Sequence, residues 1–263
     1  MKISILGCGW LGLPLGKSLL EAGHFVLGST TQESKLAILR EAGIEPFRID
    51  LSAPLISSSG SFFNSDVLVI TFPPNRKAGK TDEYLSQLRS LVQVIRSGLT
   101  RHIIFVSSTS VYADTNDVVY EGDESPDSYM VQAEHLVREE PFRTTVIRLG
   151  GLFGPDRHPG RFLAGKIDVA GGDAPVNMIH RDDAVGIISR VIEEQSWNEV
   201  FNACADQHPT RSEFYTRMSL NANLVPPVFS PDATRSFKIV SSQKMKDRLQ
   251  YTFKVPDPLH WSG

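Results

Sequence analysis

The chain has 263 residues and a formal net charge of −3, and 41% of its residues are hydrophobic. This composition is that of a globular protein with one large α/β domain, or with such a domain and a small lobe. The charge balance argues against binding to nucleic acid or to an anionic membrane. No apolar run approaches the roughly 20 residues of a membrane span. The two cysteines, Cys8 and Cys204, form no metal-like cluster, so we expect a reduced, cytoplasmic protein without a metal site.

Short apolar strands alternate with amphipathic helices from residue 1 to about residue 150. This alternation predicts an α/β fold: a Rossmann-type, doubly wound parallel sheet with a small C-terminal substrate lobe. The clearest helix is 81–97, because its apolar residues form one stripe and Gly98 follows it. The expected strands are 2–6, 24–28, 44–49, 66–70, 102–107 and 144–149, and the expected helices are 11–22, 31–42, 81–97 and 127–139.

The composition changes after residue 150, where Gly, Pro and basic residues dominate as far as Pro175. We therefore expect a dinucleotide-binding Rossmann domain at 1–150, with its sheet completed by parts of 176–204. The segments 151–175 and 205–263 are expected to form a small lobe on the substrate side.

A glycine motif joins the first strand to the first helix. Gly7, Gly9 and Gly12 form G-x-G-x-x-G in the strand–turn–helix context that indicates dinucleotide binding. The first glycine allows the tight turn, the second lets the backbone approach a pyrophosphate, and the third lets the helix pack close to the strand. Trp10 and Leu11 lie at the helix start, where backbone N–H groups are available to phosphates. The alternative is a strand–turn–helix without a ligand.

The end of the second strand reads Gly-Ser29-Thr30-Thr31, with Lys35 one turn later. An NAD site usually has a carboxylate here for the ribose hydroxyls, whereas hydroxyls and a lysine accept a 2′-phosphate. The first carboxylate is Glu33. The sequence therefore favours NADP(H), with NAD(H) possible. Alternatively, these residues only cap the second helix.

Further cofactor contacts are expected where the other strands end, because ligands bind at the carboxyl ends of parallel strands. Asp50 is placed to contact an adenine amino group, or else it is a surface turn residue. The other candidates at strand ends are Leu51, Thr71, Pro73 and Ser107.

Three later stretches carry a resemblance to a known family. They are FVSSTSVY at 105–112, RLGGLFGP at 148–155 and NMIHRDD at 177–183. Together with the glycine motif, they resemble the extended short-chain dehydrogenase/reductases of the NAD-dependent epimerase/dehydratase type. The resemblance implies that Ser108 is the catalytic serine that holds the reacting substrate oxygen. It also implies that Gly150 and Gly151 lie in the backbone that orients the nicotinamide, with Gly151 in place of the usual Asn.

The chain departs from this family at the catalytic Tyr-x-x-x-Lys pair. The alignment puts Pro126 at the tyrosine and Met130 at the lysine, and neither side chain carries an exchangeable proton. A positioned acid or base contributes about 10²–10⁴-fold to a rate, so the loss is large. The candidates for a replacement acid are Tyr129, Tyr112 and His180, although Tyr112 and His180 are also typical structural residues.

A basic loop at 154–166 follows the sixth strand and contains Arg157, His158, Arg161 and Lys166. The family resemblance implies that this region faces the substrate. Its charges suit a phosphate, a nucleotide-sugar or a carboxylate. Alternatively, the loop is solvated and paired with Asp156 and Asp168. The expected substrate-binding residues are Thr109, Arg157, His158, Arg161 and Asn177.

Three functions are compatible with these patterns. The first is an NAD(P)-dependent oxidoreductase, epimerase-like, that acts on a small, anionic or sugar-like substrate. The second is a non-catalytic NADP(H)-binding sensor or regulatory module, and the third is a degenerate fold kept as a scaffold. We expect a small-molecule substrate, no nucleic acid or membrane as a partner, and a monomer or a homodimer formed through helices 81–97 and 127–139.

Overall fold

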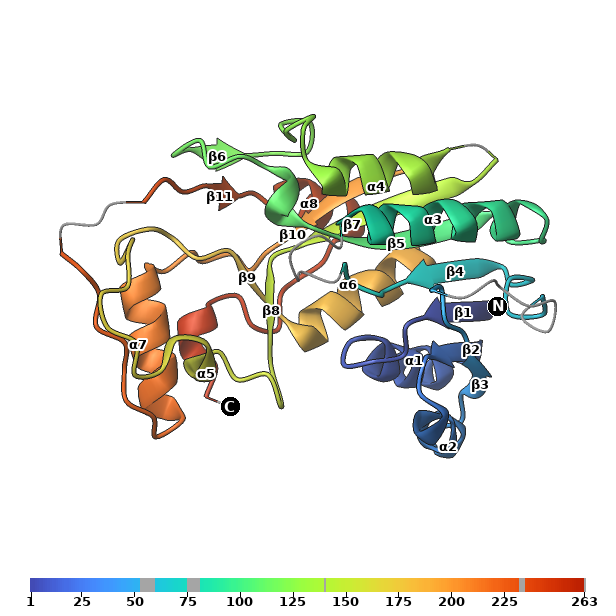
Figure 1. The fold of residues 1–263 in the computed structure, drawn as a ribbon, viewed down its shortest axis with the longest axis horizontal. Helices are drawn as coiled ribbons and strands as arrows, with labels where there is room; N and C mark the ends of the chain where they lie inside the picture. Colours follow the sequence, from blue (N-terminus) through green and yellow to red (C-terminus); the bar gives the residue numbers. More distant parts are fainter. Residues whose placement is uncertain (53–59, 75–80, 140, 232–234, 263) are drawn as a thin grey trace. The chain divides into compact units, whose positions relative to one another are not determined.

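A seven-stranded parallel sheet with the order β10-β7-β5-β4-β1-β2-β3 organises the chain (Figure 1). The computed structural model describes residues 1–52, 60–74, 81–139, 141–231 and 235–262. The strands of this sheet are β1 (Lys2–Leu6), β2 (Phe25–Thr30), β3 (Glu45–Arg48), β4 (Val67–Ile70), β5 (His102–Ser108), β7 (Arg143–Leu149) and β10 (Val200–Ala203).

The strand order reverses between β1 and β4, which makes the sheet doubly wound. From β1 the chain first moves outward to β2 and β3, and it then returns to β4 on the other side of β1. Right-handed crossovers in opposite directions put their helices on opposite faces of the sheet. The predicted Rossmann-type fold is confirmed. The helices that follow these strands are α1 (Gly12–Glu21), α2 (Leu36–Glu41), α3 (Thr81–Arg96), α4 (Tyr129–Arg138) and α6 (Arg181–Glu193).

The packing of α3 follows from its sequence. Its apolar residues recur every three or four positions, and this stripe is buried, while Asp82 and Glu83 lie in the first turn. The helix lies side by side with α4 (Figure 1). The buried residues of the stripe are Tyr84, Leu85, Leu88, Leu91, Val92 and Ile95.

The helix predicted at 31–42 is wrong in its first turn. The Thr30 hydroxyl accepts the Gln32 N–H at 3.2 Å, and Gln32 has extended backbone, so the helical part starts with a 3₁₀ turn, Glu33–Lys35. Only Leu36–Glu41 is α-helical. This local side-chain bond competes with helix formation, as is typical of threonine. The segment 52–65 is rich in serine, which predicts a loop, and residues 53–59 of it lie outside the described residues.

Contacts divide the chain into two compact units that alternate along the sequence. The predicted division at residue 150 separates a cofactor-binding domain from a substrate lobe. The contact units do not test this division, so it stays a prediction. Within the described residues, no helix is both long and apolar enough to cross a membrane. The first unit is 1–107, 126–147 and 188–200, and the second unit is 108–125, 148–187 and 201–263.

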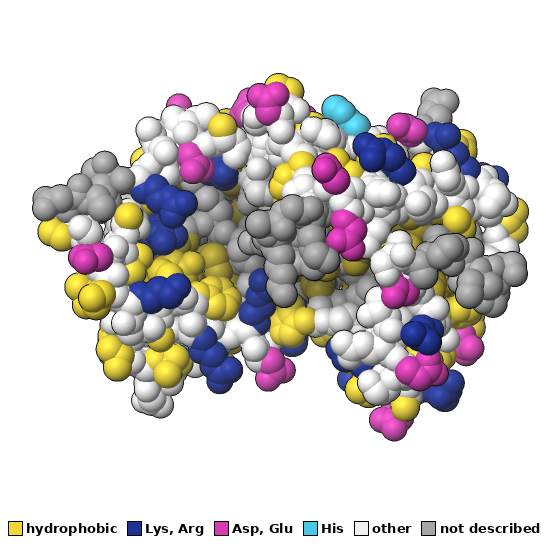
Figure 2. All heavy atoms as spheres, in the orientation of Figure 1, with side chains coloured by type: hydrophobic (Ala, Val, Ile, Leu, Met, Phe, Trp, Pro, Cys, Tyr) yellow, Lys and Arg dark blue, Asp and Glu magenta, His cyan; other side chains and the backbone are white. Residues whose placement is uncertain are grey.

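The second unit is built from short elements. β8 pairs in parallel with β9, and β11 pairs in parallel with β6. Hydrophobic side chains are interspersed with Lys and Arg over the part of the surface in Figure 2 that α5 and α7 occupy in Figure 1. The elements are η3 (Thr109–Val111), β6 (Val118–Val119), β8 (Gly151–Phe153), α5 (Gly160–Leu163), β9 (Met178–His180), α7 (Arg211–Asn221), β11 (Ile239–Val240), α8 (Gln243–Leu249) and η4 (Pro258–His260).

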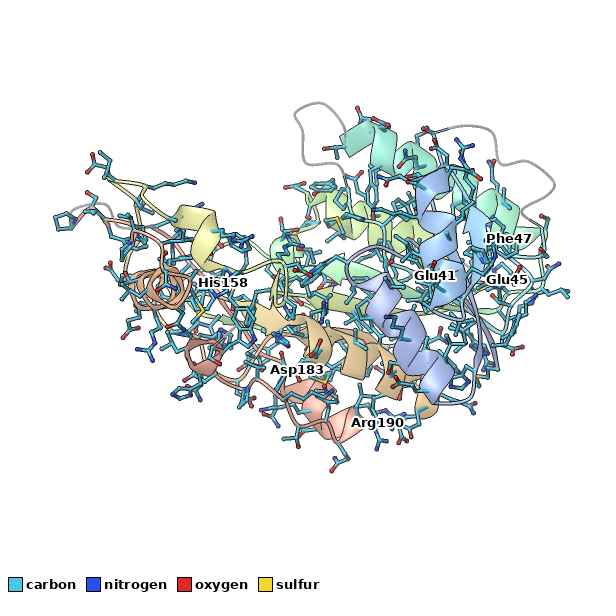
Figure 3. The ribbon with its side chains drawn as sticks, turned by 90° about the horizontal axis from the view of Figure 1, so that it is seen from below. Glu41, Glu45, Phe47, His158, Asp183 and Arg190 are labelled. Atoms are coloured by element: carbon cyan, nitrogen blue, oxygen red, sulfur yellow. The ribbon has the colours of Figure 1, made fainter. Side chains whose placement is uncertain are left out.

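A buried carboxylate fastens the C-terminal segment of the second unit. Asp183, near the start of α6 (Figure 3), accepts hydrogen bonds from the Lys254 N–H at 2.6 Å, the Val255 N–H at 3.0 Å and the Tyr251 hydroxyl at 3.1 Å. Its side chain is fully buried. Asp183 therefore satisfies backbone donors that no helix or sheet would otherwise satisfy.

We expect Asp183→Ala to lower the free energy of unfolding by about 2–4 kcal/mol, because a buried charged acceptor is lost and its three part-buried donors lose this hydrogen bond. The control is Asp182→Ala in the same turn, where an exposed side chain contributes less than about 1 kcal/mol. Urea unfolding of both variants measures the difference. Equal losses in the two variants would contradict this role of Asp183.

Candidate functional site

The glycine loop between β1 and α1 is held from both sides. Gly7 has φ of +105°, a conformation that favours glycine. Its N–H donates to the Ser29 hydroxyl oxygen at 3.0 Å, and its carbonyl accepts the Thr71 hydroxyl at 2.7 Å. The Cys8 N–H donates to the Ser29 carbonyl at 2.8 Å. Ser29 and Thr71 were expected as cofactor ligands, but their hydroxyls brace the loop instead.

The surface of this loop fits a pyrophosphate. A Cβ added at Gly9 would meet no atom within 4 Å, whereas a Cβ at Gly12 would collide with the Gly7 carbonyl. Leu11 precedes α1, and no side chain caps the helix. The loop therefore has an open face at Gly9 beside an uncapped helix N-terminus, the arrangement that binds the phosphates of dinucleotides.

We expect Gly9→Ala to leave the fold intact and to weaken dinucleotide binding at least about 10-fold, or 1.4 kcal/mol. The added methyl group lies in open space in the protein, but it would occupy the place of a bound phosphate. Gly12→Ala is the contrasting variant, because it is expected to lower the thermal midpoint as well. Calorimetric titration and thermal unfolding measure the two effects. Unchanged affinity in Gly9→Ala would contradict the proposed phosphate position.

Cys8 is a packing residue of the loop. A Cβ at Gly28 would come within 2.6 Å of its sulfur, so the two residues fit together. Burial raises the pKa of the Cys8 thiol to about 12. The thiol is therefore neutral at physiological pH and is no nucleophile.

The end of β2 carries the candidates for the ribose side of the cofactor. Thr31 and Lys35 are exposed there, and Thr30 is half-buried. Sequence reasoning missed Arg48, the last residue of β3, which pairs in register with Thr30. Its only sequence signal is that it is a cation at a strand end. Arg48 lies 3.7 Å from Glu33, and both side chains are largely exposed, so this ion pair is weak.

Three other predicted cofactor residues lie at strand ends. Asp50 is exposed, and its Oδ1 accepts the Ser52 hydroxyl at 2.6 Å and the Ser52 N–H at 2.9 Å. These hydrogen bonds lower the pKa of Asp50. Leu51 is half-buried and Pro73 is exposed. Their contacts with a cofactor stay predictions.

Ser107 and α4 make a buried polar contact in the first unit. The Ser107 hydroxyl donates to Glu134 at 2.6 Å, and both side chains are buried. The Ser107 hydroxyl is therefore engaged with Glu134, and a contact of Ser107 with a cofactor stays a prediction. On the same helix Met130 is buried in the core, so it is a packing residue. Tyr129 is half-buried at the first position of the helix.

Ser108 and Tyr112 have different environments in the second unit. The half-buried Ser108 caps η3 by accepting the Ser110 N–H at 3.2 Å. Tyr112 is buried, donates to Asn202 at 2.7 Å and accepts from Arg148 at 2.8 Å. Burial raises the pKa of Tyr112 to about 12. These contacts favour a structural role for Tyr112 over the catalytic role considered from the sequence.

Arg148 is the centre of this buried network. Its side chain is 1% exposed and forms an ion pair with Glu124 at 2.9 Å. The sequence suggested the motif that contains Arg148 but not its partners. They come from distant parts of the chain, and no short-range pattern links them.

The glycines after β7 are tightly packed in the second unit. A Cβ at Gly150 would lie 2.7 Å from the Asn177 carbonyl, and one at Gly151 would lie 2.7 Å from the Met178 sulfur. Asn177 was expected to bind substrate, but its side-chain amide donates to the Lys238 carbonyl at 2.9 Å and accepts the Val240 N–H at 2.8 Å. It fastens β11 instead. Asn177 is half-buried, and Thr109 is buried.

The basic loop presents three exposed cations, Arg157, Arg161 and Lys166. His158 lies beside α5 (Figure 3), accepts the Gly160 N–H at 3.1 Å, and packs 4.9 Å from the ring of Trp261. His180 is buried, and its Nδ1 accepts the Asp182 N–H at 3.2 Å. Burial lowers the pKa of His180. The surroundings of His180 favour the structural role over that of an acid.

The sheet order and the glycine loop define the Rossmann-type α/β class of proteins. No family model matches the chain. Protein YeeZ of Escherichia coli strain K12 is 33% identical over 271 residues, which cover 98% of this chain and 97% of that protein. The chain therefore belongs to one family with Protein YeeZ, and it has the fold of the extended short-chain dehydrogenase/reductases of the NAD-dependent epimerase/dehydratase type.

Two solved structures illustrate this fold. UDP-glucuronic acid 4-epimerase from Bacillus cereus, in complex with NAD, has a TM-score of 0.79 and 17% identity, and covers 98% of this chain and 96% of its own. UDP-glucose-4-epimerase from Stenotrophomonas maltophila, with bound NAD and formylated UDP-arabinopyranose, has a TM-score of 0.79 and 15% identity, and covers 100% and 96%. The resemblance expected from the sequence motifs is confirmed.

Proposed function

We propose that the chain is an NADP(H)-dependent, epimerase-like oxidoreductase that acts on a small, anionic or sugar-like substrate. The main support is the glycine loop, where Gly9 leaves room for a phosphate and Gly12 leaves none for a side chain. The bound nicotinamide would supply hydride transfer. The residues of the chain would bind the dinucleotide at the loop and hold the substrate oxygen at Ser108.

Ser108 is suited to hold a substrate oxygen. Its oxygen already accepts the Ser110 N–H, so its own O–H group is left to donate. A hydroxyl fixed in this way stabilises charge that develops on a substrate oxygen. Ser108 alone supplies no strong acid, and Pro126 and Met130 supply none. Of the three predicted replacements, Tyr129 is the best supported, because Tyr112 and His180 are committed to structural contacts.

A preference for NADP(H) is supported by cations at the ends of β2 and β3. Lys35 and Arg48 are exposed there, and a 2′-phosphate would gain charge-assisted hydrogen bonds from them. The neighbouring carboxylate, Glu33, already lies near Arg48. The similar epimerase structures contain NAD. The preference for NADP(H) therefore rests on the residues of this chain and not on those structures.

We expect Lys35→Ala to weaken NADPH binding about 3–10-fold, or roughly 0.7–1.4 kcal/mol, and to change NADH binding less than about 2-fold. Ser29→Ala is the matched comparison, because it disturbs the loop and should weaken both cofactors. Calorimetric titration of both variants with both cofactors gives the ratios. An equal loss for NADPH and NADH in Lys35→Ala would contradict a phosphate contact.

The oxidoreductase activity is tested by incubating the protein and NADP with a panel of sugar phosphates, nucleotide-sugars and hydroxy acids. Reduction is followed at the nicotinamide absorbance band, and the reverse direction is followed with NADPH and the matching carbonyl compounds. The proposal predicts turnover with at least one anionic member of the panel. Tight cofactor binding without any absorbance change would count against it.

A second candidate is a non-catalytic NADP(H) sensor, and the observation that favours it is the pair Pro126 and buried Met130. This candidate predicts that a partner protein binds in a manner that depends on the redox state of the cofactor. Pull-downs in the presence of NADP and of NADPH compare the two states. Identical recovery of every partner in both states would exclude a sensor.

A further inference from the structure

Arg211 differs from the other arginines that are shielded from solvent. Four arginines of the described residues are buried or half-buried: Arg148, Arg181, Arg190 and Arg211. The first three each form an ion pair with a carboxylate, at 2.9, 3.2 and 2.8 Å. The described part of the chain gives Arg211 no carboxylate within the 4.0 Å that defines an ion pair, and its buried Nε has no hydrogen-bond acceptor.

The main chain around Arg211 is fixed. The Arg211 N–H donates to the Ala174 carbonyl at 2.8 Å at the start of α7. Thr210 caps the helix, and Glu213 completes the capping box by accepting the Thr210 N–H at 2.9 Å and its hydroxyl at 2.7 Å. The carboxylate that is nearest in sequence is therefore already engaged by the cap.

The Arg211 side chain is held by an aromatic ring. Its guanidinium carbon lies 5.6 Å from the centre of the Tyr215 ring, one turn along α7. Tyr215 in turn packs 5.1 Å from Phe214 and against a buried cluster that includes Phe153 and Met218. A guanidinium over an aromatic ring is restricted in its movement and keeps its N–H groups as hydrogen-bond donors.

The same face of α7 leads to the basic loop. Residues 211, 215, 218 and 219 are spaced as one helix face. Ser219 donates to the Gly160 carbonyl at 3.1 Å, so α5 packs on this face (Figure 1). Arg211 lies eight residues before Ser219, or about 12 Å along the helix.

We propose that Arg211, stacked on Tyr215, binds an oxyanion, a carboxylate or a phosphate, through two parallel N–H···O bonds from its guanidinium edge. Among the described residues, the Arg211 guanidinium carries a positive charge without a paired carboxylate and has a buried N–H without an acceptor. An oxyanion would supply both the opposite charge and the acceptor. This site adds a substrate contact to the proposed function. The statement that the oxyanion belongs to the substrate rests on that proposed function.

Binding is tested on the full-length protein with inorganic phosphate and with malonate as probes. The arginine Nε–H resonances are followed by ¹H–¹⁵N NMR, and the Arg211 signal is assigned by its absence in Arg211→Lys. We expect a saturable shift of this signal in the wild-type protein. The affinities of the wild type and of the variants are compared by calorimetric titration, and we expect about 10-fold weaker binding to Arg211→Lys, which keeps the charge but loses the fork of donors. The probe that binds more tightly distinguishes a phosphate from a carboxylate.

Two further variants keep the test decisive. Arg217→Met removes an exposed cation from the same helix and should leave binding unchanged, whereas Tyr215→Leu should weaken binding by removing the stack. Equal binding by wild type and Arg211→Lys, equal losses in Arg217→Met and Arg211→Lys, or no shift at millimolar probe would overturn the proposal. NADPH titration of the same samples reports separately on the cofactor site. A failure of the oxyanion site can therefore be distinguished from a failure of the cofactor site.

Discussion

Arg148→Met is expected to lower the free energy of unfolding by about 3 kcal/mol. It removes the buried member of an ion pair, so that Glu124 loses its counter-charge and the buried Tyr112 hydroxyl loses a donor. The guanidinium bonds both the Glu124 carboxylate, at 2.9 Å, and the Tyr112 hydroxyl, at 2.8 Å. Methionine fills much of the same volume. The loss therefore reflects missing hydrogen bonds and charge rather than a cavity.

The matched control is Arg96→Met. Arg96 forms an ion pair with Glu139 at 2.8 Å, but the two side chains are 44% and 53% exposed, so the loss should stay below about 1 kcal/mol. Urea unfolding monitored by circular dichroism measures both variants. Similar small losses would show that Arg148 contributes no more than a surface arginine, and the account of the buried network would be wrong.

Ser108→Ala is expected to lower kcat by about 10²–10³-fold for any substrate that the protein reduces or oxidises, because one donor to the reacting oxygen is lost. Cofactor affinity should change little, because Ser108 is not part of the glycine loop that is proposed to bind the cofactor. The control is Ser110→Ala: Ser110 is exposed, and only its backbone N–H takes part in the contact with Ser108. Steady-state kinetics of the two variants gives the comparison.

An equal decrease in kcat for both serine variants would point to disturbance of η3 rather than to loss of a donor. Unchanged kcat in Ser108→Ala would remove Ser108 from the reaction. In that case the resemblance to the family would hold for the fold but not for the mechanism.

The glycine loop could be predicted from sequence because its requirements are local. Gly7 needs its positive φ, and Gly12 needs to lack a side chain, and both requirements follow from a strand–turn–helix of fixed length. The apolar stripe of α3 was predictable for the same reason, since helix period alone determines which residues are buried. Resemblance at three further motifs extended the prediction to the whole fold.

Side-chain partners distant in the sequence could not be predicted. Asn177 was expected to bind substrate, yet residues more than 60 positions away occupy both ends of its amide. Ser29 was expected to meet a phosphate, but β2 directs its hydroxyl to Gly7. In both cases the residue type is compatible with either role, and the contacts within the protein depend on the position of another element, which the sequence does not show.

One missed element did carry a local signal. Thr210 and Glu213 form the capping box at the start of α7, and the spacing of threonine and glutamate is readable in the sequence. By contrast, the missing acceptor of Arg211 is a property of its surroundings, and no motif contains it. The sequence therefore indicates the fold and the dinucleotide loop better than it indicates the groups that would select a substrate.

The most direct test of the central claim is calorimetric titration of the purified protein with NADPH, NADP, NADH and NAD. We predict saturable binding of one dinucleotide per chain, tighter for the 2′-phosphorylated forms, and a loss of affinity in Gly9→Ala without a change in thermal midpoint. Absence of binding by all four dinucleotides, under conditions where the protein is folded, would contradict the account.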